Sequence, residues 1–163
     1  PGVLLHLERF IFERTSAGPG QFSRREEHPC SVTDGQKRSL VLVRNNMELL
    51  AVMLQGGNDS RKEPVVLGIR DTDFYLSCHK DGDKPTLHLE EVEDKASLSE
   101  ISVESDMRRF LFYKRDMAVN ISTLMSALFP NWYISTATDN NRPVAMCQES
   151  ASRYRTFSIQ RQS

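Results

Sequence analysis

The densest run of side chains capable of catalysis is Cys78-His79, followed closely by Asp81 and Asp83. A cysteine nucleophile needs a base within hydrogen-bond reach, and His79 is the nearest candidate in the sequence. Neighbouring side chains on a strand point to opposite faces, however, so the thiol and the imidazole should not meet. Free cysteine is also among the most frequently buried residue types. We therefore expect Cys78 to be a buried structural residue and the chain not to be an enzyme.

Metal and cofactor sites are not predicted either. His6, His28, His79 and His88 are dispersed and show no paired-ligand spacing, and the three cysteines include no CxxC pair. The stretch QGGND at 55–59 lacks the lysine and the helix of a phosphate-binding loop. The pattern predicts no metal and no cofactor.

Composition narrows the class of partner. The 163 residues are 39% hydrophobic, enough for one core, and 21 Lys and Arg face 22 Asp and Glu for a net charge of −1. This balance gives no general attraction to nucleic acid, and no apolar run is long enough for membrane insertion. The odd cysteine count favours folding in a reducing compartment, and the start PGVLLHLERF has no signal-peptide pattern. We expect a processed or truncated product.

The pattern of short apolar runs and turn residues predicts an all-β domain. Residues 1–28 contain a Gly-, Ser- and Pro-rich stretch and are interpreted as an N-terminal extension, with the domain at 29–163. Short strand-like runs separated by turn signals such as TDGQK and KDGDKP then recur at the spacing of a sandwich or barrel. These runs lie at 30–32, 38–43, 48–55, 64–69, 74–79, 86–92, 108–114, 121–128, 132–137, 143–148 and 155–160.

Two of these runs form an internal repeat. The tetrapeptide FYLS at 74–77 matches WYIS at 132–135, and Lys84-Pro85 and Arg142-Pro143 follow at the same spacing. A repeated β unit of this length is typical of a radially repeated fold. Trp132 is then expected to pack in the scaffold. If the units are equivalent, the first unit lacks a strand near 59–63, and either that segment is missing or residues 3–12 fill the sheet edge.

The fragments VVLGIRDTDFYLSCHKDGDKPTLHLEEV, RRFLFYKRD and FPNWYISTATDNNRPV resemble the interleukin-1 family of cytokines, in family order from about Cys30 to the end. The resemblance implies a β-trefoil of short antiparallel strands with a pseudo-threefold repeat, one strand missing in its first unit. One departure is Leu124-Met125-Ser126-Ala127, where the family usually has Phe-Glu-Ser-Ala. This leucine is a modest core change.

The resemblance also implies two receptor-binding regions. The first would face two immunoglobulin-like receptor domains, and the second would face the third domain. Carried over by position, the first region comprises Thr33, Asp34, Gln36, Lys37, Glu48, Met53, Gln55, Gly56, Asn140, Asn141 and Arg142, and the second comprises Lys114 and Asp116. Thr33, Met53 and Arg142 depart from the family residues, as does Glu63 beside the second region.

The function implied is a secreted pro-inflammatory cytokine, made in the cytosol without a leader and acting outside the cell. It would bind the interleukin-1 type 1 receptor and recruit its accessory chain, with a decoy receptor as a further partner, and act as a monomer. A receptor antagonist of the same family is the alternative. Two other trefoil classes rank lower, because a heparin-binding growth factor needs a basic patch and a protease inhibitor needs a stiffened loop.

Overall fold

The computed structural model describes residues 2–15, 18–43, 48–52 and 62–162, and these form thirteen strands and two short 3-10 helices. The strands are β1 (Leu4–Thr15), β2 (Gly18–Asp34), β3 (Arg38–Val43), β4 (Glu48–Val52), β5 (Lys62–Ile69), β6 (Phe74–Asp81), β7 (Lys84–Glu91), β8 (Glu100–Ser102), β9 (Leu111–Ala118), β10 (Ile121–Ser126), β11 (Tyr133–Ser135), β12 (Ala145–Cys147) and β13 (Thr156–Arg161). The helices are η1 (Lys95–Leu98) and η2 (Asp106–Phe110). Each of the eleven predicted runs overlaps an observed strand.

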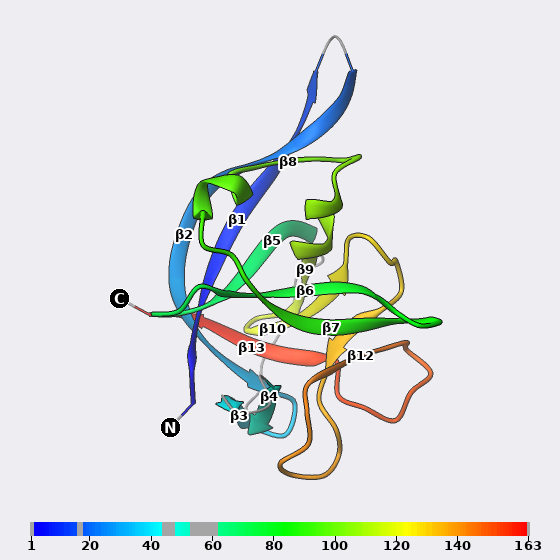
Figure 1. The fold of residues 1–163 in the computed structure, drawn as a ribbon. Coiled ribbons are helices and arrows are strands. Elements are labelled where there is room, and N and C mark those ends of the chain that lie inside the picture. The colour runs from blue at the N-terminus through cyan, green and yellow to red at the C-terminus, as the bar shows by residue number, and fades with distance from the viewer. Residues whose placement is uncertain (1, 16–17, 44–47, 53–61, 163) are drawn as a thin grey trace.

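Antiparallel pairing closes a barrel. Going round it, β1 pairs with β2, β2 with β13, β13 with β10, β10 with β9, β9 with β5, and β5 again with β1. The hairpins β3–β4, β6–β7 and β11–β12 are attached to this ring, and Figure 1 shows them around one end of it. A barrel with three attached hairpins is the β-trefoil arrangement, so the predicted fold class is confirmed.

Strand β1 occupies the position where the sequence predicted a gap. Leu5 lies opposite Cys30 on one side and Ile69 on the other, and Arg9 lies opposite Glu26 and Val65. Of the two explanations offered for the gap, the structure therefore supports the second, because residues 5–9 of the predicted segment 3–12 pair with β5. Residues 59–61 of the predicted gap lie outside the described part of the chain.

The β1–β2 hairpin is longer than the barrel needs. Pairing continues from Leu4 opposite Ser31 to Thr15 opposite Gly18, and the far end of the hairpin projects beyond the barrel in Figure 1. Strand β2 runs without a break through the predicted boundary between residues 28 and 29. The interpretation of residues 1–28 as an N-terminal extension left from a precursor stays a prediction, and residues 4–15 of it form the barrel strand β1 in this structure.

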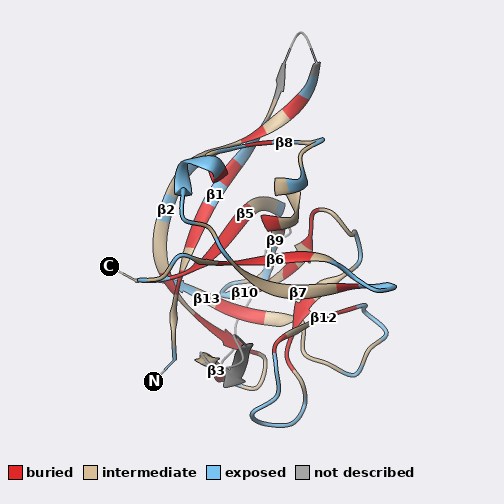
Figure 2. Ribbon diagram, viewed as in Figure 1, coloured by how far each residue is buried: buried red, intermediate tan, exposed pale blue. Residues whose placement is uncertain are grey.

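Side-chain alternation divides the apolar residues of neighbouring strands between two cores. Leu5 and Leu7 of β1, with Val65 and Leu67 of β5, belong to the cluster inside the barrel, whereas Val66 belongs to the second cluster. This is the period of two expected when each strand has two covered faces. The two buried regions follow the barrel strands in Figure 2.

The second cluster lies under the base of the hairpin. It joins Phe10 and Phe22 of the hairpin to Tyr75, Leu98 and Phe110, and so ties the hairpin to β6 and to both 3-10 helices. The register shifts between Arg9 and Phe10 because β2 has an extra residue here, Arg25, and such a bulge bends the strand that contains it. The hairpin is therefore fixed to the body by packing as well as by pairing.

A buried ion pair lies in this region. Glu8 is completely buried, its Oε1 accepts a hydrogen bond from Arg24 Nη1 at 2.7 Å, and its Oε2 has no partner among the described residues. Burial raises the pKa of Glu8 above its usual range, and the hydrogen bond from Arg24 partly opposes this. The neighbouring Tyr75 hydroxyl also has a raised pKa, first through burial and then through the charge of Glu8.

Glu8 should give the protein a measurable pH dependence of stability. A carboxyl with a raised pKa binds its proton more tightly in the folded state, so stability falls as pH rises from 4.5 through the folded pKa. We expect Glu8→Gln to remove this fall, measured by urea unfolding between about pH 4 and pH 7. Glu13→Gln, at an exposed acid of the same strand, is the control. Equal slopes for wild type and Glu8→Gln would contradict the assignment.

Candidate functional site

The turn between β2 and β3 is built around the buried carboxylate of Asp34. Its Oδ1 accepts hydrogen bonds from the backbone N–H groups of Gln36 and Arg38, at 3.0 and 2.9 Å, and its Oδ2 accepts one from Arg38 Nε at 3.0 Å. Both partners of the ion pair are almost fully buried. A carboxylate that receives several N–H bonds fixes a turn firmly, so the backbone of residues 34–38 is held in one shape.

The same network holds a distant loop. The Thr136 hydroxyl donates to Asp34 Oδ2 at 2.6 Å, and Arg38 donates to the carbonyl oxygens of Ala137 and, at 2.6 Å, of Asp139. Segments about a hundred residues apart in the chain are thus fixed side by side, and Figure 1 shows the loop after β11 beside the turn after β2. This geometry brings together two of the segments of the first predicted region, the turn at 33–37 and the loop at 140–142.

The exposed residues of this pair of loops are the ones available to a partner. Lys37 and Asn140–Arg142 are exposed and Gln36 is partly buried, whereas Thr33 is 8% exposed and Asp34 is fully buried. Lys37 and Asn141 both have positive φ, at 66° and 59°, which marks tight turns. The side chains of Thr33 and Asp34 therefore position the loops instead of presenting groups to solvent.

Four further residues of the first predicted region lie wholly or partly outside the described residues. Glu48 begins β4 and lies opposite Val43 in the pairing with β3. Its side chain, and Met53, Gln55 and Gly56 entirely, lie outside the described residues. Their assignment to a receptor-binding region stays a prediction.

The second predicted region is part of a line of alternating charges. Lys114 Nζ lies 2.7 Å from Asp116 Oδ1 and 3.8 Å from Glu63 Oε1, and the Arg9 guanidinium joins Glu63 to Glu26 at 2.9 and 2.7 Å. Lys114 is only 15% exposed at its side chain, because β5 pairs Glu63 directly opposite it. Sequence reasoning found Lys114 and Asp116 but missed Arg9 and Glu26, which belong to the N-terminal strands.

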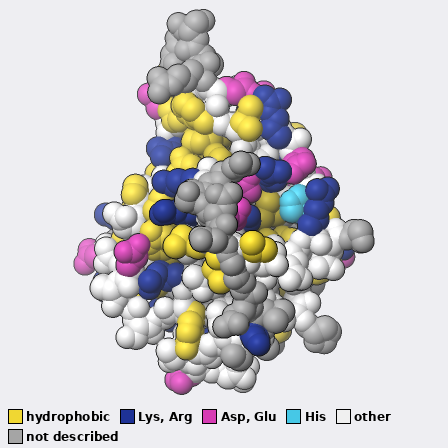
Figure 3. All heavy atoms as spheres, turned by 180° about the vertical axis from the view of Figure 1, so that it is seen from behind, with side chains coloured by type: hydrophobic (Ala, Val, Ile, Leu, Met, Phe, Trp, Pro, Cys, Tyr) yellow, Lys and Arg dark blue, Asp and Glu magenta, His cyan; other side chains and the backbone are white. Residues whose placement is uncertain are grey.

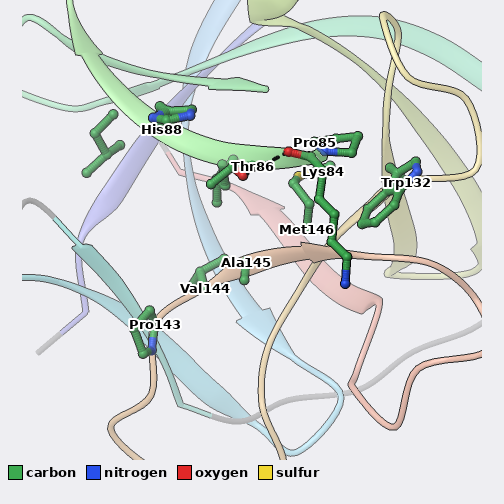
Figure 4. Close-up of a pocket in the computed structure, with 11 residues that line it drawn as sticks. Lys84, Pro85, Thr86, His88, Trp132, Pro143, Val144, Ala145 and Met146 are labelled. Atoms are coloured by element: carbon green, nitrogen blue, oxygen red, sulfur yellow. Dashed lines mark hydrogen bonds between the residues drawn. The ribbon is translucent and has the colours of Figure 1, made fainter. Parts of the chain in front are cut away.

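A groove separates the two repeated hairpins. Figure 4 shows it lined from one side by Lys84, Pro85, Thr86 and His88 of β7, and from the other by Trp132 and by Pro143–Met146 at β12. Trp132 packs against the barrel core from this position, as predicted. Lys84 and Pro85 of the first sequence repeat and Pro143 of the second therefore line the same groove.

Two histidines are stacked beside this groove. The rings of His79 and His88 are parallel to within 6° and their centroids are 3.7 Å apart. Burial lowers the pKa of His88, and the nearby His79 lowers it further, while Asp81 and Glu90 act in the opposite direction. Two imidazoles so close cannot both be charged without repulsion.

The described residues show no arrangement for catalysis at Cys78. The thiol is completely buried, and burial raises its pKa to about 11, while His79 stacks on another histidine. Cys30 is likewise buried, with its pKa raised to about 12, and Cys147 is a third free buried thiol. Within the described ranges there is no group of three or more metal-binding side chains, and no helix there has the length and apolar character to cross a membrane.

The fold is that of a β-trefoil protein, and two of its polar surface loops are held together by the Asp34–Arg38 network. Comparison with known proteins gives the family: residues 43–159 match the interleukin-1/18 family, and this chain belongs to it. It is 40% identical over 131 residues to interleukin-1 beta of Bubalus carabanensis, covering 71% of this chain and 47% of that protein. It is 39% identical to the human protein over the same length, with 71% and 46% covered.

Solved structures agree on the fold. Chicken interleukin-1 beta matches with a TM-score of 0.63 at 22% identity, covering 94% of this chain and 99% of that one. Interleukin-36alpha matches with a TM-score of 0.56 at 23% identity, covering 82% and 94%. The chain spans about half the length of the curated relatives it matches. The family is one of cytokines, and not of enzymes, which confirms the expectation drawn from Cys78.

Breaking the Asp34–Arg38 pair should release both loops. We expect Arg38→Met to cost about 3–5 kcal/mol, because it keeps most of the side-chain volume but leaves a buried carboxylate without its cation. Urea unfolding measures the loss, and amide exchange at residues 137–142 should speed up. Lys37→Ala, next to it but exposed, should change stability by no more than about 0.5 kcal/mol. A stable Arg38→Met with a protected loop would refute this role of the network.

The stacked histidines predict a second pH effect, of opposite sign to that of Glu8. Because the folded-state pKa of His88 is lowered, stability is complete above its usual value of 6.5 and is lost as pH falls through the folded pKa. We expect His88→Gln to reduce the loss of unfolding free energy between about pH 7.5 and pH 5. His6→Gln, at a partly exposed histidine on β1, is the control variant. A profile unaffected by His88→Gln would rule out this source.

Proposed function

We propose that this protein is a pro-inflammatory cytokine that binds the interleukin-1 type 1 receptor and then recruits the receptor's accessory chain. The observation that carries the proposal is the Asp34–Arg38–Thr136 network, which fixes two distant loops as one surface in a chain of this family. A rigid scaffold with polar loops is a common way to build a binding site. Preformed loops also lose less conformational entropy when a partner binds.

The first contact region in this proposal is the paired-loop surface. Lys37 and Arg142 supply exposed positive charge, and Gln36, Asn140 and Asn141 supply amide groups. Charged and amide groups of this kind give an interface specificity and speed its association. Met53, Gln55 and Gly56 are assigned to the same region from the family resemblance alone.

The second contact region is centred on Lys114 and Asp116. Their ion pair is part of the ordered line of charges that also includes Glu63 and Arg9. Pairing within the protein leaves this surface with little net charge. We therefore expect it to fix the orientation of the receptor through local complementarity more than to attract the receptor from a distance. A receptor that contacts both regions would follow an extended path over the domain.

No chemistry is required in this mechanism. Binding free energy favours the receptor-bound state, and the composite surface then favours the accessory chain, which brings the two intracellular signalling parts together. We infer that the protein is made in the cytosol, is released, and acts outside the cell as a monomer. A decoy receptor that shares the same contacts is a further expected partner.

The test measures binding of the receptor ectodomain and signalling in receptor-bearing cells. We expect wild-type protein to bind and signal, and Lys37→Glu combined with Arg142→Glu to weaken binding at least tenfold, because two contact charges are reversed. Lys95→Glu on η1 reverses an exposed charge outside both regions and is the control. Thermal unfolding checks that each variant is folded.

Different outcomes separate the alternatives. Binding of wild-type protein without signalling, together with loss of signalling by an agonist added alongside it, would identify a receptor antagonist. No binding of the wild-type protein to the ectodomain would refute the proposed function. Equal loss of binding by the control variant would refute the location of the first contact region.

A further inference from the structure

An apolar groove lies where the β1–β2 hairpin leaves the barrel. It is lined by aromatic and aliphatic side chains of the hairpin and of the strand and helix segments below it: Phe10, Ile11, Phe12, Phe22, Pro64, Val103 and Tyr113. Lys62, Arg9, Glu63 and Arg108 border these residues. The view from behind in Figure 3 shows hydrophobic side chains gathered below the hairpin tip, with basic and acidic groups around them.

The exposure of these residues is unusual for this protein. Ile11 and Phe12 are 40% and 45% exposed, and they are two of the four large hydrophobic side chains found exposed among the described residues. The Phe12 ring packs on Phe22 with centroids 5.2 Å apart, and Gly20 below it has no space for a side chain. The aromatic surface is therefore held in place by its supports and is not a loose side chain.

The groove continues into the second contact region. Arg9 and Glu63 border the groove, and they also line the neighbouring charged hollow that contains Lys114 and Asp116. The Arg9–Glu63 ion pair thus forms the rim that the apolar groove shares with the hollow, and Lys114–Asp116 lies on the other side of that rim. An apolar centre beside a polar, charged rim is the usual anatomy of a protein interface.

We propose that this apolar groove is a docking surface for the same receptor chain that contacts Lys114 and Asp116, through the receptor's third immunoglobulin-like domain. This inference rests on the proposed function. It adds residues 10–12 and 22, which lie outside the family match at 43–159, to the contact surface. Phe12 is the expected hot spot, because it is aromatic, exposed before binding and rigidly supported.

The expected partner has an apolar protrusion flanked by both signs of charge. The charged residues at and beside the shared rim are already paired within the protein. The rim therefore favours a partner surface on which positive and negative groups alternate over a surface with a large net charge. Lys62 lies with its Nζ 4.8 Å from the centre of the Tyr113 ring and extends the apolar floor while keeping its charge in water. These features suit a folded protein surface.

The experiment compares two exposed apolar side chains in receptor-ectodomain binding. Phe12→Ala, alone and with Ile11→Ala, should weaken binding at least tenfold, whereas Phe12→Trp should keep most of the affinity. Met117→Ala is the matched control, since Met117 is 43% exposed but lines a separate hollow with Tyr133 and Arg155. Its affinity should stay within about twofold of wild type. Thermal unfolding confirms that every variant is folded.

The possible outcomes separate failure of the docking surface from failure of the proposed function. Unchanged affinity in the folded Phe12 variants, with loss of binding in Lys37→Glu combined with Arg142→Glu, would overturn the docking surface and leave the proposed function standing. If wild-type protein fails to bind, both are overturned. Sedimentation velocity tests whether a second copy of the chain occupies the groove instead. If the wild-type protein self-associates and Phe12→Ala abolishes this without changing receptor affinity, the groove binds a second copy and the inference is overturned.

Discussion

The pairing of β1 with both β2 and β5 is the constraint on which this structure depends. Backbone N–H and C=O groups at a sheet edge need partners, and without β1 the ring from β2 through β13, β10 and β9 to β5 would remain open. Leu5 and Leu7 then fill the barrel from this strand, and residues beyond the register shift at Arg9/Phe10 build the second cluster. One segment thus closes the barrel and attaches the hairpin.

Two buried carboxylates, each paired with an arginine, lie along the β1–β2 hairpin. Glu8 with Arg24 lies at the base of the hairpin, and Asp34 with Arg38 lies where β2 ends. Burying a charge pair gives little net stability, since the loss of hydration is comparable to the attraction gained. What such a pair supplies is geometry, because the carboxylate is satisfied in only one arrangement of its partners. The Asp34 pair is the more fully bonded of the two, and it is the one that orients loops.

The sequence indicated the strands from Cys30 onward because their signals are local. Alternating apolar residues, Gly82 at a tight turn and the matched FYLS and WYIS runs all lie within a few residues of the structure they specify. The role of β1 depends on contacts with β5, about sixty residues away, and the Gly- and Pro-rich start of β2 that follows β1 resembles a linker in sequence. The burial of Thr33 and Asp34 could not be predicted from the sequence either. A polar residue in a turn gives the same local sequence pattern whether its side chain faces solvent or a distant loop.

The two repeated hairpins show how binding loops can arise from a common scaffold. In the first copy the ladder continues to Asp81 opposite Lys84, which leaves a two-residue turn, whereas in the second it stops at Ser135 opposite Ala145. The second ladder stops because Thr136 bonds elsewhere: its backbone pairs with Tyr154 and its hydroxyl with Asp34. Arg38 then takes the next carbonyl groups, so residues that form a strand in one copy become an exposed loop in the other. The network that ends the hairpin is therefore the same one that creates the proposed contact surface.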